Sequence, residues 1–189
     1  LDRLFRNEGQ KVADYAENLT DAVRKINLPE EEAGTGLPTL QAMETWVGQW
    51  SRRFDPEYGG SQGAPKFMMP VTLRFLMHWG QEQEDQTVSQ HVRNTLTRMA
   101  YGGLYDPVGG GFARYSVDAR WHVPHFEKML YDNAHLAELY LDAESLWPGR
   151  GYAEIGLRTI EFMQQSLASV DGGYYASLSA VDENDIEGG

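Results

Sequence analysis

The residues best suited to acid–base chemistry are concentrated in a glycine- and aromatic-rich segment, residues 106–133. Glu127 is the carboxylate expected to be partly buried there, which would raise its pKa and suit a general acid or base. For hydrolysis, Glu127 or Asp106 would act as general acid and Asp182 as the second carboxylate of a glycosidase pair. For epimerisation, His125 would move a proton beside a sugar carbonyl, since the pKa of histidine lies near neutrality. The catalytic candidates are therefore Asp106, His125, Glu127 and Asp182.

The same segment contains groups that could hold a polar, ring-shaped ligand such as a sugar. Arg114 supplies a cation and Trp121 a flat apolar surface. Lys128 and Asp132 lie on the polar side of a predicted helix, where they can also pair with each other. These four residues are substrate-binding candidates. The alternatives are ordinary packing for the aromatic residues, a solvated face for the polar ones and an ion pair for Glu127.

His122 and His125, with Asp118 and Glu127 near them in the sequence, could bind a metal ion, because imidazole and carboxylate suit several divalent ions. Pro124 interrupts this run, so its spacing matches no helical ligand pair. The sequence also has no phosphate-binding loop, nucleophile elbow or dinucleotide fingerprint. We therefore expect no metal and no other cofactor.

The composition limits the partners of the chain. A net charge of −12 would repel both a nucleic-acid backbone and an anionic membrane. There is no cysteine, which excludes disulfides and thiolate chemistry within this sequence. No apolar run approaches the roughly 18 residues that a membrane span needs. A soluble compartment, most simply the cytoplasm, is expected.

The spacing of apolar residues predicts six helices. They are expected at residues 7–26, 39–54, 70–79, 85–99, 124–147 and 152–169. In the fifth of these, one face would carry Phe126, Leu130, Ala134, Ala137 and Leu141, and the opposite face His125, Lys128, Asp132 and His135.

Three long loops, at residues 54–67, 102–124 and 170–189, each combine an aspartate, a Gly-Gly pair and aromatic residues. Two helices and a long loop that recur in this way are typical of a helical array. Loops of this length are usually functional, and a closed toroid places alternate loops around one mouth. We therefore predict an all-α fold, an α/α toroid of helical hairpins with about half of a six-hairpin ring present. The alternative is three short hairpins with surface loops.

Three runs carry a resemblance to a known family: GGSQGAPKF, GGLYDPVGGGFARYSVDARWHVPHFEKMLYDNAHLAELYL and GGYYASLSAVDENDIEGG. From about Thr39 onward the chain resembles the family of thioredoxin-domain-containing proteins that includes spermatogenesis-associated protein 20. The resemblance implies a thioredoxin-fold domain followed by a six-hairpin toroid similar to those of glycosidases and N-acylglucosamine 2-epimerases. Residues 1–38 would be a connecting helix and linker from a thioredoxin-like domain that this sequence lacks. Residues 39–189 would be the first half of the toroid, truncated at its C-terminal end. The resemblance adds Lys66 to the substrate-binding candidates.

Together these features predict a carbohydrate-active toroid, either a glycoside hydrolase or a sugar epimerase or isomerase. Its polar cavity would be lined by loops 102–124 and 170–189. The alternative is a non-catalytic module that binds a protein or a saccharide. An enzyme predicts polar side chains that converge on one pocket, whereas a binding module predicts an aromatic groove whose carboxylates are neutralised by Arg114 or Lys128. An apolar open edge of the ring would favour self-association.

Overall fold

The computed structural model describes residues 8–27 and 36–181. The chain divides into two compact units, Leu1–Met43 and Glu44–Gly189. The first unit contains α2 (Gly9–Asn27), and α3 (Leu40–Ser51) continues into the second. The candidate Asp182 lies outside the described residues. Within the described ranges, no helix is both long enough and apolar enough to cross a membrane.

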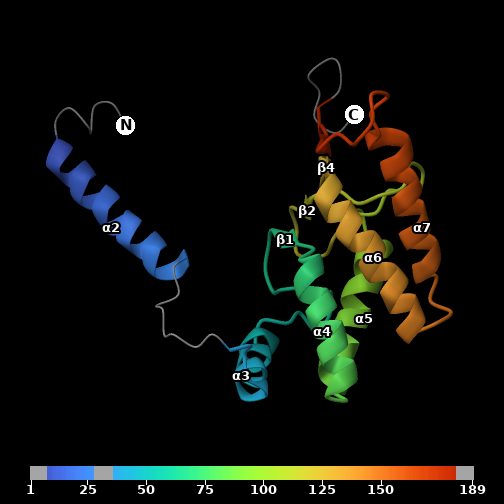
Figure 1. Cartoon of the computed structure of the whole chain (residues 1–189), viewed down its shortest axis with the longest axis horizontal. Helices are drawn as coiled ribbons and strands as arrows, with labels where there is room; N and C mark the ends of the chain where they lie inside the picture. Colours follow the sequence, from blue (N-terminus) through green and yellow to red (C-terminus); the bar gives the residue numbers. More distant parts are fainter. Residues whose placement is uncertain (1–7, 28–35, 182–189) are drawn as a thin grey trace. The chain divides into compact units, whose positions relative to one another are not determined.

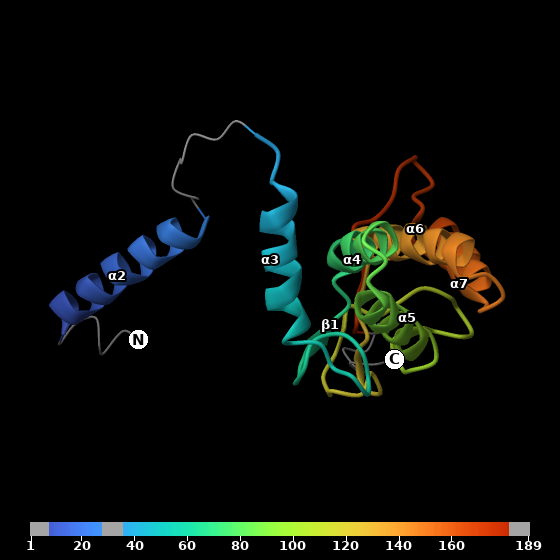
Figure 2. The ribbon, with the colours of Figure 1, turned by 90° about the horizontal axis from the view of Figure 1, so that it is seen from below.

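The second unit is built mainly from helices. Its further helices are α4 (Pro70–Glu82), α5 (Gln86–Ala100), α6 (Leu130–Leu146) and α7 (Tyr152–Phe162), followed by the π-helical turn η1 (Met163–Leu167). Helix α4 packs against both α5 and α6, and α6 packs against α7 (Figures 1 and 2). Helices α4 and α6 begin at the same end of the unit, where the long loops gather (Figure 1).

Local sequence explains where these helices begin. Pro70 occupies the first turn of α4, where its missing N–H costs nothing. Asp85 caps α5, because its Oδ1 accepts the N–H groups of Thr87 and Val88, both at 3.0 Å. The two helices are therefore joined by only a few residues and pack as an antiparallel hairpin.

The core lies between the helices. Its fully buried side chains include Leu76, Met77, Val92, Leu96, Met99, Leu136, Leu139 and Tyr140. The Tyr140 hydroxyl donates to the Leu96 carbonyl at 2.7 Å, which ties α6 to α5 and satisfies a buried polar group. Burial raises the pKa of Tyr140 well above its ordinary value, so the phenol stays neutral.

The loop end of the unit contains short strands. These are β1 (Lys66–Phe67), β2 (Tyr115–Ser116), β3 (Pro124–His125), β4 (Lys128–Met129) and β5 (Ser177–Leu178). The first three form an antiparallel sheet in the order β1-β2-β3, and β4 pairs antiparallel with β5.

These strands correct one prediction. The helix expected to begin at Pro124 begins at Leu130, because residues 124–125 pair with β2 and residues 128–129 pair with β5. His125 and Lys128 therefore do not share a helical face with Asp132. The last predicted helix also differs, since its C-terminal part is the π-helical turn. The remaining helices lie within a few residues of their predicted bounds.

Candidate functional site

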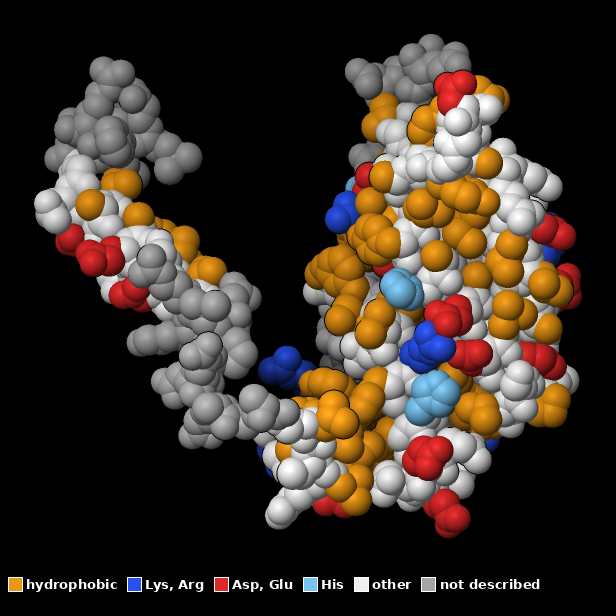
Figure 3. All heavy atoms as spheres, in the orientation of Figure 1, with side chains coloured by type: hydrophobic (Ala, Val, Ile, Leu, Met, Phe, Trp, Pro, Cys, Tyr) orange, Lys and Arg blue, Asp and Glu red, His pale blue; other side chains and the backbone are white. Residues whose placement is uncertain are grey.

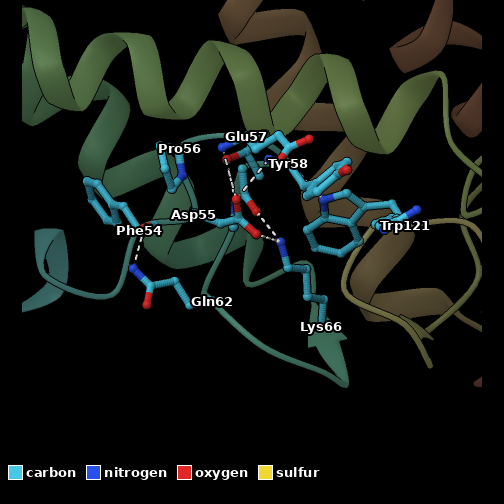
Figure 4. A network of polar contacts seen from close by, with 12 residues as sticks. Phe54, Asp55, Pro56, Glu57, Tyr58, Gln62, Lys66 and Trp121 are labelled. Carbon is cyan, nitrogen blue, oxygen red and sulfur yellow. Dashed lines mark hydrogen bonds and ion pairs between the residues drawn. The ribbon is translucent and has the colours of Figure 1, made fainter.

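The first long loop is closed by a buried ion pair (Figure 4). Lys66 Nζ lies 2.6 Å from Asp55 Oδ2 and donates to the Gly59 carbonyl at 2.7 Å. The other carboxylate oxygen of Asp55 accepts the N–H groups of Glu57 and Tyr58 at 3.0 and 2.9 Å. Burial would raise the pKa of Asp55, but these hydrogen bonds outweigh it and lower the pKa below its ordinary value.

The second long loop repeats this arrangement. Lys128 Nζ lies 2.8 Å from Asp106 Oδ2 and donates to the Gly110 carbonyl at 2.9 Å. Asp106 Oδ1 accepts the N–H groups of Val108 and Gly109 at 2.8 and 2.9 Å. Partial burial would raise the pKa of Asp106, but the Lys128 and backbone hydrogen bonds lower it overall. A general acid needs the opposite shift.

The two loops share the sequence Asp-Pro-x-x-Gly-Gly, at residues 55–60 and 106–111. In each loop the residue before the aspartate bridges the residue after the second glycine, Phe54 to Ser61 and Tyr105 to Phe112. The third loop has the shorter form of this turn, with Ser169 N–H donating to the Gly173 carbonyl at 3.0 Å. The ion pair between a lysine and the loop aspartate, which we call the lysine clamp, is therefore a feature of the first two loops. It fixes each loop to the start of the helix that follows the lysine, α4 or α6.

Trp121 is fully buried between the first two loops. Its Nε1–H donates to the Tyr58 carbonyl at 2.8 Å, and Lys66 Nζ lies 5.4 Å from the centroid of its ring (Figure 4). The indole joins the two loops and has no exposed face on which a ligand could stack.

The three-stranded sheet carries a row of rings, which we call the aromatic ladder: Phe67, which is exposed, and Tyr115 and His125, which are partly buried. Strand register places them opposite one another on neighbouring strands. The centroid of the Tyr115 ring lies 5.1 Å from that of Phe67 and 4.8 Å from that of His125. Half of the Phe67 side chain is exposed. The alternate residues of the strands, Lys66 and Ser116, are buried on the other face.

An ion pair lies beside the aromatic ladder. Arg114 precedes Tyr115 in the chain, and its Nη1 lies 2.8 Å from Glu127 Oε2. The main chains of the same two residues are also joined, by a 2.8 Å hydrogen bond from Arg114 N–H to the Glu127 carbonyl. The hydrogen bond to Glu127 raises the pKa of Arg114 above its ordinary value. Both side chains retain exposed surface, so the pair can reach a ligand.

The Asp132 carboxyl is partly buried, and its pKa is shifted upward. Burial raises its pKa, and the nearby Arg114 and His135 only partly oppose that shift. Within the part of the chain that the structure describes, the Asp132 carboxylate accepts no hydrogen bond. It is therefore free to bind or exchange a proton with a ligand.

Asp132 begins a polar stripe along α6 that continues through His135, Glu138 and Asp142. Arg74 of α4 bridges two members of the stripe, with 2.6 Å to Glu138 and 3.3 Å to Asp142. Figure 3 shows basic, acidic and histidine side chains gathered on the face over α4 and α6. The stripe thus extends a polar surface from the aromatic ladder along the helices.

The structure gathers Arg114, His125, Glu127 and Asp132 around the sheet. It places Lys66, Asp106, Trp121 and Lys128 in the contacts that hold the loops together. Sequence reasoning missed Phe67 as a surface residue and Asn133 as a buried one. Asn133 accepts the Phe112 N–H at 2.7 Å and donates to the Met129 carbonyl at 2.8 Å, so it fixes the second loop on α6. No signal in the sequence marked either residue.

The largest of the four best-defined cavities in the second unit has a volume of about 690 Å³. All four are lined by residues between 44 and 98, so none of them contains a residue of loops 102–124 or 170–189. Phe67 of the aromatic ladder lines one of these cavities, of about 330 Å³, whereas Tyr115, His125 and the Arg114–Glu127 pair line none of the four. Across residues 8–27 and 36–181, no three His, Asp or Glu side chains are arranged to hold a metal ion.

Sequence comparison links the chain to larger proteins. No family model matches it. It is 43% identical to human spermatogenesis-associated protein 20 over 136 residues, which cover 70% of this chain and 17% of the relative. The mouse protein is 40% identical over the same length and coverage. An uncharacterised protein of Caenorhabditis elegans is 31% identical over 182 residues, covering 94% of this chain and 25% of the relative. The chain thus spans a quarter or less of these curated relatives.

Structural comparison identifies the fold. A sugar epimerase from a ruminal bacterium superposes with a TM-score of 0.63 at 14% identity, covering 70% of this chain and 37% of that one. Cellobiose 2-epimerase from Spirochaeta thermophila gives 0.58 at 20% identity, covering 70% and 36%. The Bacillus thermoamylovorans enzyme gives 0.57 at 15% identity, covering 72% and 42%. The predicted fold, an α/α toroid built of helical hairpins, is therefore confirmed.

Proposed function

We propose that this chain forms a saccharide-binding wall of a carbohydrate-active α/α toroid. The observation that carries the proposal is the partly exposed aromatic ladder with the Arg114–Glu127 pair beside it. A sugar ring has apolar C–H faces and a polar rim, so it suits a flat aromatic surface bordered by charged hydrogen-bonding groups. The solved sugar epimerases with the same fold make this ligand class the natural one to test.

For chemistry, we propose proton transfer at a sugar carbon, as in an epimerase or isomerase, in preference to glycoside hydrolysis. Asp106 is held ionised by Lys128, and Glu127 is paired with Arg114. Each carboxylate is already bound to a basic side chain, whereas the general acid of a glycosidase must have a proton to donate. His125 stays the proposed proton-transfer group, and Asp132, whose pKa is raised, is the proposed second one. Asp182 stays a prediction.

Of the predicted binding residues, we retain Arg114 and Asp132 as ligand contacts. We propose that Lys66, Lys128 and Trp121 act indirectly, by holding the loops that present the aromatic ladder. The thioredoxin-like domain implied by the sequence resemblance remains part of this proposal for the whole protein.

One observation favours the second candidate function, a non-catalytic saccharide-binding module. Both Asp106 and Glu127 are already neutralised by basic partners, which is what a binding groove predicts. Both functions use the aromatic ladder to bind a sugar, and they differ only in whether the bound sugar is converted to a product.

Incubation with unlabelled sugars in D2O distinguishes them. An epimerase or isomerase incorporates deuterium at the carbon beside the sugar carbonyl, and His125→Ala abolishes this while leaving the fold intact. A protein that binds a sugar but exchanges no deuterium is a binding module. Release of a free monosaccharide from a glycoside, without exchange, would contradict the proposed chemistry.

A further inference from the structure

The 690 Å³ cavity lies between α5 and the start of the first long loop, and it shares Phe54 and His91 with the 330 Å³ cavity that Phe67 lines. We call it the α5 pocket. Its walls include Phe54, Gln86, Thr87, Gln90, His91 and Asn94. None of its lining residues belongs to the aromatic ladder or to the Arg114–Glu127 pair. Its volume is within the usual range for small-molecule sites, roughly 300–1,000 Å³.

Uncharged polar groups project into the α5 pocket from one ridge of the helix. Gln86, Gln90 and Asn94 follow one another at four-residue steps, so their amides lie one above the next. Gln90 accepts from Arg93 at 2.9 Å through its oxygen, which leaves its NH2 group to donate. Asn94 uses its NH2 group on the loop carbonyls, which leaves its oxygen to accept. The ridge therefore offers both donors and acceptors.

His91 forms the buried end of the α5 pocket. It is 9% exposed, and its ring stacks on Phe54 with 3.5 Å between the ring centroids and 1° between the planes. Among the described residues, no hydrogen bond to either of its ring nitrogens is present. Burial chiefly lowers the pKa of His91 to about 4, and the Lys66 charge adds to the effect. The neutral ring provides one donor and one acceptor, held in a fixed orientation.

We propose that the α5 pocket binds an uncharged, polyhydroxylated molecule such as a single sugar unit. Its hydroxyl groups would form hydrogen bonds with His91 and with the side-chain amides of Gln86, Gln90 and Asn94. Hydroxyl groups donate and accept at once, which matches the mixed lining. The charged groups of the lining offset one another, since Asp55 is paired with Lys66, and Glu57 and Arg98 bring one charge of each sign. The α5 pocket is thus a second site, and it does not depend on the function proposed for the aromatic ladder.

The test is a titration of the protein with glucose, N-acetylglucosamine and sorbitol, followed by the side-chain ¹H–¹⁵N NMR signals of the histidines. We expect the His91 signals to shift at saturation while remaining those of a neutral ring. His91→Phe keeps the stacked ring without its nitrogens, and Gln90→Ala removes one amide. We expect each to weaken binding at this site at least tenfold. Gln164→Ala, an exposed glutamine outside the α5 pocket, is the matched control and leaves binding unchanged.

Tyr115→Ala separates the two sites, because Tyr115 lines neither of the two cavities that His91 lines. If the α5 pocket is a site of its own, Tyr115→Ala leaves the His91 shifts intact even where it abolishes binding at the aromatic ladder. No His91 shift with any of the three compounds would overturn the proposal. So would undiminished binding in both His91→Phe and Gln90→Ala, or stronger shifts with glucose 6-phosphate or glucuronate than with glucose.

Discussion

Lys66 and Lys128 occupy the same place in two copies of one turn, yet their surroundings differ. Lys66 is 1% exposed and its partner Asp55 13% exposed, whereas Lys128 and Asp106 are 12% and 36% exposed. The cost of leaving a carboxylate without its ammonium partner increases with burial, because water cannot replace the lost hydrogen bond.

We therefore predict that Lys66→Met destabilises the protein by about 3–5 kcal/mol. The equivalent change Lys128→Met should cost less, about 1–2 kcal/mol, because water can reach Asp106. Urea denaturation followed by circular dichroism measures both. Equal losses in the two variants would contradict the assignment of a buried and a half-exposed clamp.

His91 makes stability depend on pH. Its pKa falls from 6.5 in the unfolded chain to about 4 in the folded one, chiefly through burial. Between these pH values the His91 imidazole is protonated in the unfolded state but not in the folded state. The free energy of unfolding therefore decreases as the pH falls from 6.5 to 4. The loss amounts to about 3 kcal/mol, at a slope of at most ~1.4 kcal/mol per pH unit.

His91→Phe should flatten this dependence. The variant is compared with the parent in urea at several pH values, because acid also weakens the clamps of Asp55 and Asp106, whose pKa values are lowered. Parallel curves for the two proteins between pH 4 and 6.5 would show that His91 is not buried as a neutral ring.

At the scale of single residues, sequence reasoning named part of the candidate surface. The side-chain type alone was enough to identify four charged or titratable residues as candidates: Arg114, His125, Glu127 and Asp132. Whether a carboxylate is free or paired depends on partners distant in the sequence, as with Asp106 and Lys128, 22 residues apart. Phe67 was missed because nothing local indicates that it lies in register with Tyr115.

At the scale of secondary structure, the helices could be predicted from the periodicity of apolar residues, but the short strands could not. Residues 124–129 contain no alternation long enough to indicate a strand, and their pairing with β2 and β5 comes from distant segments. The sequence showed a Gly-Gly pair in each long loop, and the structure shows that two loop glycines are constrained in different ways.

Gly110 and Gly63 allow the effect of close packing to be separated from that of backbone strain. Both have positive φ, but a Cβ on Gly110 would lie 2.6 Å from the Arg158 carbonyl oxygen, whereas a Cβ on Gly63 meets nothing within 4 Å. Gly63→Ala should cost about 1 kcal/mol from backbone strain alone. Gly110→Ala should cost about 2–4 kcal/mol, because α7 must also move away. Thermal unfolding of both variants tests this, and similar melting temperatures would contradict close packing of the loop on α7.

For the whole molecule, the repeat of helices and loops predicted a helical array, and the length of the loops favoured a closed toroid. Neither inference needs a contact map. Burial of the inner surface could not be predicted in the same way. Large apolar side chains stay exposed along α3 and α4, including Trp46, Trp50 and Val71 at 43%, 40% and 64%.

We predict that a protein limited to residues 1–189 self-associates through such surfaces. Light scattering coupled to size-exclusion chromatography should give a mass that rises with concentration above the monomer mass of 21.3 kDa. Val71→Lys should reduce the effect. A monomeric mass at every concentration would argue against an open apolar edge.

The central claim is that the aromatic ladder binds a saccharide, and calorimetric titration of the protein with cellobiose and its monosaccharide tests it most directly. Tyr115→Ala removes the middle ring, and Val117→Ala, an exposed apolar residue two positions on, is the control. The account predicts that Tyr115→Ala weakens binding at least tenfold, a loss of about 1.4 kcal/mol or more, while Val117→Ala binds like the parent. Equal affinity in Tyr115→Ala and the parent would contradict it.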